Sequence, residues 1–90
     1  MTALEKQFLN QLYHEGLGKK ATGRYLGCDF FGTISGVRVA YGGDLSVSID
    51  FDDEDHIFIG GSDERDSIIL SGTDFLQGGS GISENLHIYM

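Results

Sequence analysis

Residues 45–52 alternate strictly between apolar and polar side chains, and this pattern constrains the fold more than any other feature of the chain. The apolar positions are Leu45, Val47, Ile49 and Phe51, and the polar positions are Ser46, Ser48, Asp50 and Asp52. Because successive side chains of a β-strand point to opposite faces, the segment predicts a strand with one buried and one solvated face. Such a strand is typical of an antiparallel sheet, so we expect the four apolar side chains to be buried.

A helical period replaces this alternation at the N-terminus. The apolar residues that recur there at every fourth position are Leu4, Phe8 and Leu12. Thr2 and Glu5 have the spacing of a capping box, which marks the start of a helix. Gly16 followed by Leu17 is typical of a left-handed helix stop. We therefore predict a helix over about residues 2–15, with its three regularly spaced apolar side chains covering the core.

The rest of the chain has strand character, divided by glycine- and aspartate-rich turns. Further short strands are predicted at residues 37–41, 56–59, 67–71 and 86–90. The adjacent Phe30 and Phe31 interrupt the alternation of residues 28–34 and indicate a bulge or a bent strand. These elements predict a single α+β domain over residues 1–90, in which an N-terminal helix packs on a five- or six-stranded antiparallel sheet. The β-meander would occupy about residues 24–90, either as an open sheet or as a small barrel.

Charge is divided unevenly along the chain, whose net charge is −8. Residues 1–43 hold five Lys or Arg residues and three carboxylates, whereas residues 44–90 hold one Arg and eleven carboxylates. This acidity disfavours direct binding to nucleic acid or to an anionic membrane. There is no apolar run near the roughly 20 residues that span a bilayer, and no basic start followed by an apolar stretch. We therefore expect a cytoplasmic protein, in the host cytoplasm if the chain is phage-encoded.

Residue types that support catalysis or metal binding do not fall at a recognised spacing. Cys28, His14, His56 and His87 lack the separations of known metal or thiol–imidazole sites. Cys28 is better explained as a small apolar side chain beside Phe30. The serines form no nucleophile elbow either. We expect no enzymatic activity, no metal and no cofactor.

One glycine-rich segment resembles a known repeat. Its residues are Gly72, Asp74, Leu76, Gly78, Gly79 and Gly81, and their spacing is similar to the nonapeptide of calcium-binding parallel β-rolls. The resemblance implies calcium at Asp74 and at the neighbouring glycine carbonyls. The next repeat has Ser83 where an Asp is expected. Turns separated by the length of a strand explain the same glycines, and the two interpretations stay open.

The densest charge lies between Asp44 and Asp66, which contains nine carboxylates and one Arg. The candidate partner-binding residues are Asp50, Asp52, Asp53, Glu54, Asp55, Asp63, Glu64 and Asp66. If residues 45–52 pair with residues 56–61, these carboxylates run along one edge of a hairpin. Carboxylates on one face of a strand lie about 6.8 Å apart, which is sparser than duplex phosphates, so DNA mimicry would need a second row or a homodimer. A solvated face that keeps a small sheet soluble is the other interpretation.

These observations favour a small, acidic, non-catalytic binding protein that inhibits a basic, nucleic-acid-handling partner by occupying its charged groove. In size and charge the chain is similar to phage or mobile-element inhibitors, including anti-CRISPR proteins and DNA mimics. An immunity protein that neutralises a toxin nuclease is an alternative. A structural or accessory β-module with hydrophobic contacts is another. A small basic patch, formed by Lys19, Lys20 and Arg24, would stabilise the helix end or contact an acidic spot on a partner.

Overall fold

The computed structural model describes residues 2–52, 57–59, 63–65, 67–79 and 81–90, and for residues 57–59 and 63–65 it describes the backbone only. The elements in chain order are α1 (Ala3–Glu15), β1 (Lys20–Tyr25), β2 (Cys28–Val39), the 3₁₀ turn η1 (Tyr41–Gly43), β3 (Leu45–Phe51), β4 (Ile57–Ile59), β5 (Asp63–Arg65), β6 (Ser67–Ser71), α2 (Gly72–Gln77) and β7 (Ser83–Tyr89). The α+β class with an N-terminal helix is therefore confirmed.

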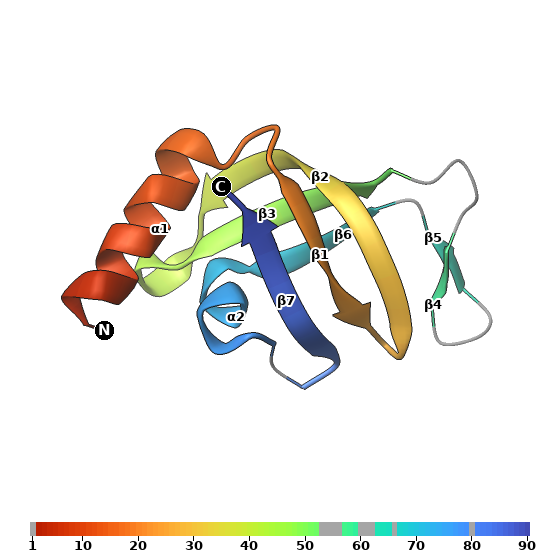
Figure 1. Ribbon diagram of the computed structural model, residues 1–90. Helices are drawn as coiled ribbons and strands as arrows, with labels where there is room; N and C mark the ends of the chain where they lie inside the picture. The colour runs from red at the N-terminus through yellow and green to blue at the C-terminus, as the bar shows by residue number, and fades with distance from the viewer. Residues whose placement is uncertain (1, 53–56, 60–62, 66, 80) are drawn as a thin grey trace.

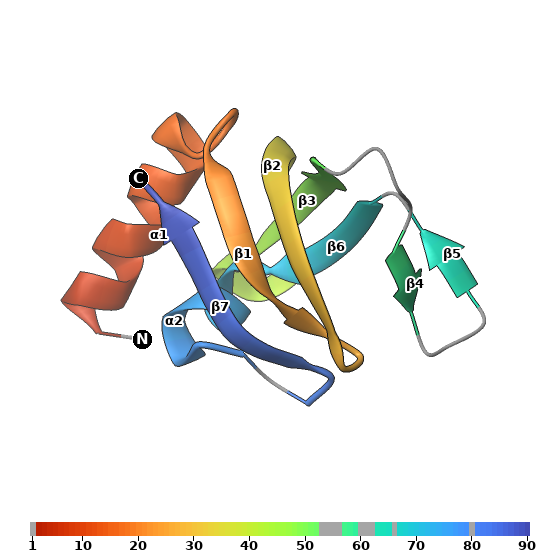
Figure 2. The same cartoon turned by 45° about the vertical axis from the view of Figure 1, so that its right-hand side comes forward.

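Five of the strands form one antiparallel sheet in the order β6-β3-β2-β1-β7. The sheet is strongly curled, so that β1 and β7 pass in front of β3 and β6, but it does not close into a barrel (Figures 1 and 2). The strands β4 and β5 pair only with each other and stand to one side of this sheet. The predicted pairing of residues 45–52 with 56–61 is wrong, because β3 is hydrogen-bonded to β2 and β6.

The core fills the concave side of the sheet. Its buried apolar residues are Leu9, Leu12, Ala21, Phe30, Ile34, Leu45, Val47, Ile49, Ile68, Leu70, Phe75, Leu86 and Ile88. The predicted burial is confirmed for Leu45, Val47 and Ile49, whereas Phe51 is partly buried. The prediction for Leu4 is wrong, because the face of α1 that reaches the core is centred further along the helix and leaves Leu4 78% exposed.

The sequence predicts the start of α1 correctly but not the way the helix ends. The predicted capping box is confirmed: the Glu5 amide donates to Thr2 Oγ1, and the Thr2 amide donates to Glu5 Oε1, both at 3.2 Å. The predicted left-handed stop at Gly16 is wrong, because Gly16 keeps a right-handed helical φ of −71°. A Cβ at Gly16 would lie 2.6 Å from the side chain of Leu12, so close packing is what requires glycine there.

Strand β2 keeps its alternation through the adjacent phenylalanines. Phe30 faces the core and Phe31 faces outward, 47% exposed. The predicted break in the alternation of residues 28–34 is therefore wrong, whereas the alternative of a bent strand agrees with β2, which begins at Cys28 and curves along its length (Figure 1). The irregularity lies just beyond, where the register with β3 shifts between Ile34 and Gly36.

The glycine-rich segment contains a helix that sequence patterns did not predict. Residues 72–77 form α2, and Gly78 ends it in the left-handed region at φ +76°. The segment therefore does not adopt the parallel β-roll that its glycine spacing resembles. The sheet also extends past the predicted limits, since β1 starts at Lys20 and β7 starts at Ser83.

Candidate functional site

The predicted acidic residues are only partly within the described ranges. Asp50 and Asp52 lie at the end of β3, and their side chains are described. Asp63 and Glu64 lie in β5, for which the backbone alone is described. The remaining four, Asp53, Glu54, Asp55 and Asp66, lie outside the described residues.

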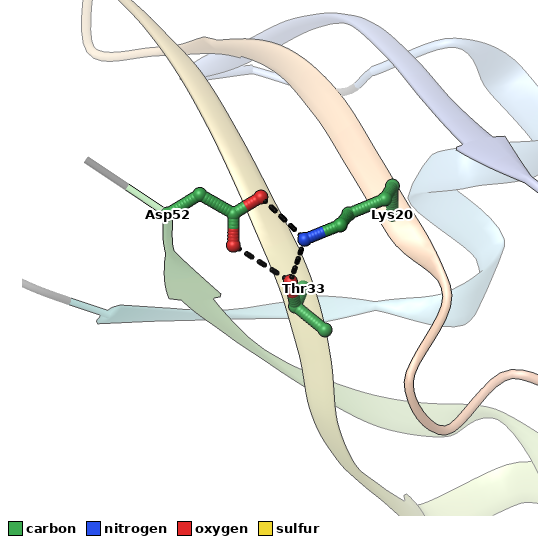
Figure 3. A network of polar contacts seen from close by, with 3 residues as sticks. All are labelled: Lys20, Thr33 and Asp52. Atoms are coloured by element: carbon green, nitrogen blue, oxygen red, sulfur yellow. Dashed lines mark hydrogen bonds and ion pairs between the residues drawn. The ribbon is translucent and has the colours of Figure 1, made fainter.

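Asp52 belongs to a three-residue network that crosses three strands (Figure 3). Lys20 Nζ donates to Asp52 Oδ2 at 2.8 Å and to Thr33 Oγ1 at 2.7 Å. The Thr33 hydroxyl donates in turn to Asp52 Oδ1 at 2.6 Å. The hydrogen bonds from Lys20 and Thr33 hold the pKa of Asp52 below its ordinary value. Both oxygens of this carboxylate are therefore occupied within the protein.

Asp50 has fewer polar partners among the described residues than Asp52 has. It is exposed and accepts a hydrogen bond from Ser35 Oγ at 3.2 Å. Across the sheet it pairs with Thr33 on β2 and with Ser67 on β6. Among the ion pairs that join described residues, none includes Asp50.

A second group of charges lies at the other end of β1. Arg24 Nε donates to Asp29 Oδ1 at 3.0 Å, and Arg24 Nη1 lies 3.8 Å from Glu84 Oε2. The hydrogen bond and charge of Asp29 raise the pKa of Arg24 above its ordinary value. Of the three predicted basic-patch residues, Lys20 and Arg24 are therefore bound to carboxylates of the sheet.

Asp44 has a structural role that sequence patterns did not indicate. Its carboxylate accepts from the Leu45 amide at 2.7 Å, from the Thr73 amide and hydroxyl at 3.1 Å, and from the Ser71 hydroxyl. Burial is the largest single influence on its pKa and raises it, but these hydrogen bonds together hold the pKa below the ordinary value. The carboxylate thereby ties the start of β3 to the start of α2. Ser71 and Thr73 are 27 and 29 residues away from Asp44 in sequence, so no local sequence motif predicts these two contacts.

The convex face of the sheet carries exposed apolar side chains among these charges. Phe31 is 47%, Tyr89 53% and Ile69 68% exposed. His87 packs edge-on against Tyr89, with ring centroids 4.5 Å apart. His87 is exposed on this face.

The described residues also contain one largely apolar pocket of about 400 Å³ between α1 and the β2–β3 connection. Leu9 and Leu45 contribute to its lining, together with Tyr13 and Val39.

In the part of the chain that the structure describes, no three His, Cys, Asp or Glu side chains are grouped so that they could hold a metal ion. Cys28 is partly buried.

No family model, curated protein or solved structure matches the chain. Within the described ranges, no helix is long and apolar enough to cross a membrane. The functional conclusion therefore depends on the geometry and charge of the chain itself.

Proposed function

We propose that this chain is a small, acidic, non-catalytic binding protein whose partner presents a basic contact surface. The observation that supports this most is how charged residues are divided between the sheet and residues 53–66. On the five-stranded sheet, Lys20 and Arg24 are bound to neighbouring carboxylates. Residues 53–66, by contrast, contain six carboxylates and a single Arg. This acidic stretch joins β3 to β6 and includes the β4–β5 hairpin, which lies to one side of the sheet (Figure 1).

A basic groove that binds phosphates is a suitable partner for such a segment. Opposite charge accelerates encounter, and carboxylates form charge-assisted hydrogen bonds with Lys and Arg. A carboxylate-rich segment in that groove would exclude nucleic acid and inhibit the partner. We therefore propose an inhibitor of a nucleic-acid-handling protein, of the phage or mobile-element kind that includes anti-CRISPR proteins and DNA mimics. An immunity protein of a toxin nuclease would use the same chemistry on a different partner.

A second candidate is a structural or accessory β-module, and the exposed side chains of the convex face favour it. Phe31, Ile69 and Tyr89 could supply an apolar contact, since aromatic residues are frequent anchors of protein interfaces. Salt separates the two candidates. Charge-steered binding weakens as ionic strength rises, whereas apolar contacts are much less affected.

The test compares two triple variants that remove the same number of charges. The first replaces Asp53, Glu54 and Asp55 by their amides, and the matched control replaces Glu15, Asp29 and Glu84 by theirs. The partner is captured from a host lysate, identified and purified, and its association with each variant is followed by surface plasmon resonance. We expect the first variant to bind about tenfold more weakly or worse, mainly through slower association, while the control changes binding less than about threefold.

Competition with a DNA duplex completes the test. If the proposal is correct, the wild-type protein displaces the duplex from the partner, and the first variant does so only at a higher concentration. Equal losses in both variants would mean that net charge alone matters. An unchanged affinity of the first variant at moderate salt would reduce the acidic stretch to a solvated segment and favour the β-module.

A further inference from the structure

The sheet has two edges, and the edge formed by β7 is protected. The Leu86 amide, which points away from β1, donates to the Gly78 carbonyl at 2.9 Å. Gly79 passes so close to the backbone of β7 that no Cβ would fit there. The Met90 amide donates to the Ile88 carbonyl at 3.2 Å. The outward amides of Leu86 and Met90 are therefore satisfied within the protein, and the Gly78–Gly79 segment covers the first half of this edge.

The opposite edge, β6, has no such contacts with the residues that the structure describes. Amides alternate sides along a strand, and the Asp52 amide donates to the Phe31 carbonyl of β2 at 2.9 Å. The backbone amides of even-numbered residues of β3 thus point toward β2, and those of odd-numbered residues point toward β6. Because Val47 pairs with Leu70 and Ile49 pairs with Ile68, the amides of Ile68 and Leu70 are the ones in β6 that point toward β3. The amides left on the outer edge are those of Ser67, Ile69 and Ser71. No backbone hydrogen bond joins these three to another segment that the structure describes.

The side chains of β6 do not block this edge either. Residues 67–71 contain no charge and no proline, the usual devices against strand addition. Ile69, at the centre, is 68% exposed. The adjacent elements β3 and α2 carry Asp50 and Asp74 but no Lys or Arg. Arg38 of β2 lies opposite Ser46, two strands in from the edge.

We infer that the edge of β6 docks an extended, basic segment of the partner, which adds to the sheet as a further strand. The inference rests on the proposed function and specifies how its partner binds. Backbone hydrogen bonds from Ser67 and Ile69 supply affinity, and a basic side chain of the segment meets Asp50, which pairs with Ser67 in the sheet. A second copy of the chain is a poorer occupant, because each copy has a net charge of −8.

Synthetic peptides test the inference without knowledge of the natural partner. The probe is a fluorescent peptide of alternating lysine and valine, titrated to about 1 mM by anisotropy at low salt. One control is the same peptide with alternate backbone amides N-methylated, which keeps the charge but cannot pair as a strand. The other control replaces lysine by glutamate. We expect the first peptide alone to bind, and hydrogen exchange at the Ile69 amide to slow at least tenfold in the complex.

Two variants locate the contact on the protein. Ile69→Pro removes the outward amide, and an edge strand tolerates this when the amide faces solvent. Ile69→Thr trims the apolar side chain but keeps the amide. We expect the proline variant to bind the lysine peptide at least tenfold more weakly and the threonine variant less than threefold, with folding of both verified by circular dichroism. The methylated peptide provides the same comparison on wild-type protein if the proline variant unfolds.

The outcomes separate this inference from the proposed function. Equal binding of the methylated and unmethylated lysine peptides overturns strand addition but remains consistent with the proposed basic partner. Equal binding of the glutamate and lysine peptides overturns the basic partner, and with it the occupant inferred here. Absence of binding by any peptide overturns the inference, and so does a wild-type dimer in sedimentation that Ile69→Pro converts to monomer.

Discussion

The five-stranded sheet and the acidic stretch of residues 53–66 contain similar residue types but distribute their charge differently. On the sheet, two carboxylates lie beside cations from other strands: Asp52 pairs with Lys20 across β2, and Asp29 of β2 pairs with Arg24 of β1. The acidic stretch has six carboxylates and one Arg within fourteen positions. Acidic residues of the chain therefore fall into two groups. Asp44 and Asp52 join elements of the sheet domain through hydrogen bonds, and the acidic stretch is the segment that we propose contacts the partner.

The largest effect is expected from a charge placed in the core of the sheet. Val47 has no exposed surface and lies on the central part of β3. Val47→Asp should unfold the protein, since an unpaired buried charge costs several kcal/mol and a domain of this size has about 5–15 kcal/mol in total. Ser46→Asp, one residue away on the opposite face, should shift the thermal midpoint by only a few degrees. A Val47→Asp protein with an unchanged midpoint would contradict the strand register.

A smaller loss is expected at Asp44. Asp44→Ala removes the acceptor of the Thr73 amide and of the Ser71 and Thr73 hydroxyls, and should lower the free energy of unfolding by about 2 kcal/mol. Denaturant unfolding measures this, and Asp50→Ala is the control, expected to cost less than about 0.5 kcal/mol. Equal losses in the two variants would mean that Asp44 does not hold β3 and α2 together.

The pH dependence of Asp44 has a definite sign. Its folded pKa lies below the ordinary value, so its contribution is present above about pH 4 and is lost as the pH falls through the folded pKa. The stability of the wild-type protein should therefore fall more steeply in acid than that of Asp44→Ala. Parallel curves would contradict the hydrogen-bonded carboxylate.

The network of Asp52 should contribute less, because its members are partly exposed. Asp52→Asn is expected to cost about 0.5–1 kcal/mol, and Lys20→Met a similar amount. A double-mutant cycle on these two residues isolates their coupling, which should be favourable and should decline at high salt. Because its pKa is also lowered, the contribution of Asp52 should likewise disappear as the pH falls below about 4. A coupling energy of zero would mean that Asp52 and Lys20 do not stabilise the fold through their ion pair.

The smallest expected effect is that of calcium. Residues 72–77 are helical, and Asp44, Ser71 and Thr73 are hydrogen-bonded to one another at the start of α2. Millimolar calcium should therefore leave the melting temperature unchanged, since a ligand specific for the native state must raise it. A clear rise in the melting temperature that Asp74→Asn abolishes would show a calcium site and support the resemblance of the glycine-rich segment to calcium-binding repeats.

Local patterns predicted the elements whose determinants are adjacent in sequence. The capping box at Thr2 and Glu5 and the alternation of β3 depend on residues within a few positions, and both are confirmed. Leu4 was misassigned because its spacing alone does not say where the helix meets the sheet. The helix α2 was missed because its sequence contains glycine and few apolar residues, and because its start is stabilised by Asp44 from a distant strand.

The candidate site was less predictable for the same reason. Acidic density in sequence identified the stretch, but it did not distinguish Asp50, which is exposed, from Asp52, which is bound to Lys20. That pair spans 32 positions, and only the strand order brings it together. The position of β6 at an edge of the sheet also follows from the strand order, which the sequence of the strand itself does not reveal.

Thermal unfolding of two triple variants tests the division between sheet and stretch most directly. One variant replaces Asp29, Asp44 and Asp52 by asparagine, and the other replaces Asp53, Glu54 and Asp55 by their amides. We predict that the sheet variant melts about 10 °C or more below wild type, since about 1 kcal/mol corresponds to about 4–8 °C in a domain of this size. The stretch variant should melt at the wild-type temperature or slightly above it, because like charges are removed. A stretch variant that is destabilised as much as the sheet variant would contradict the account.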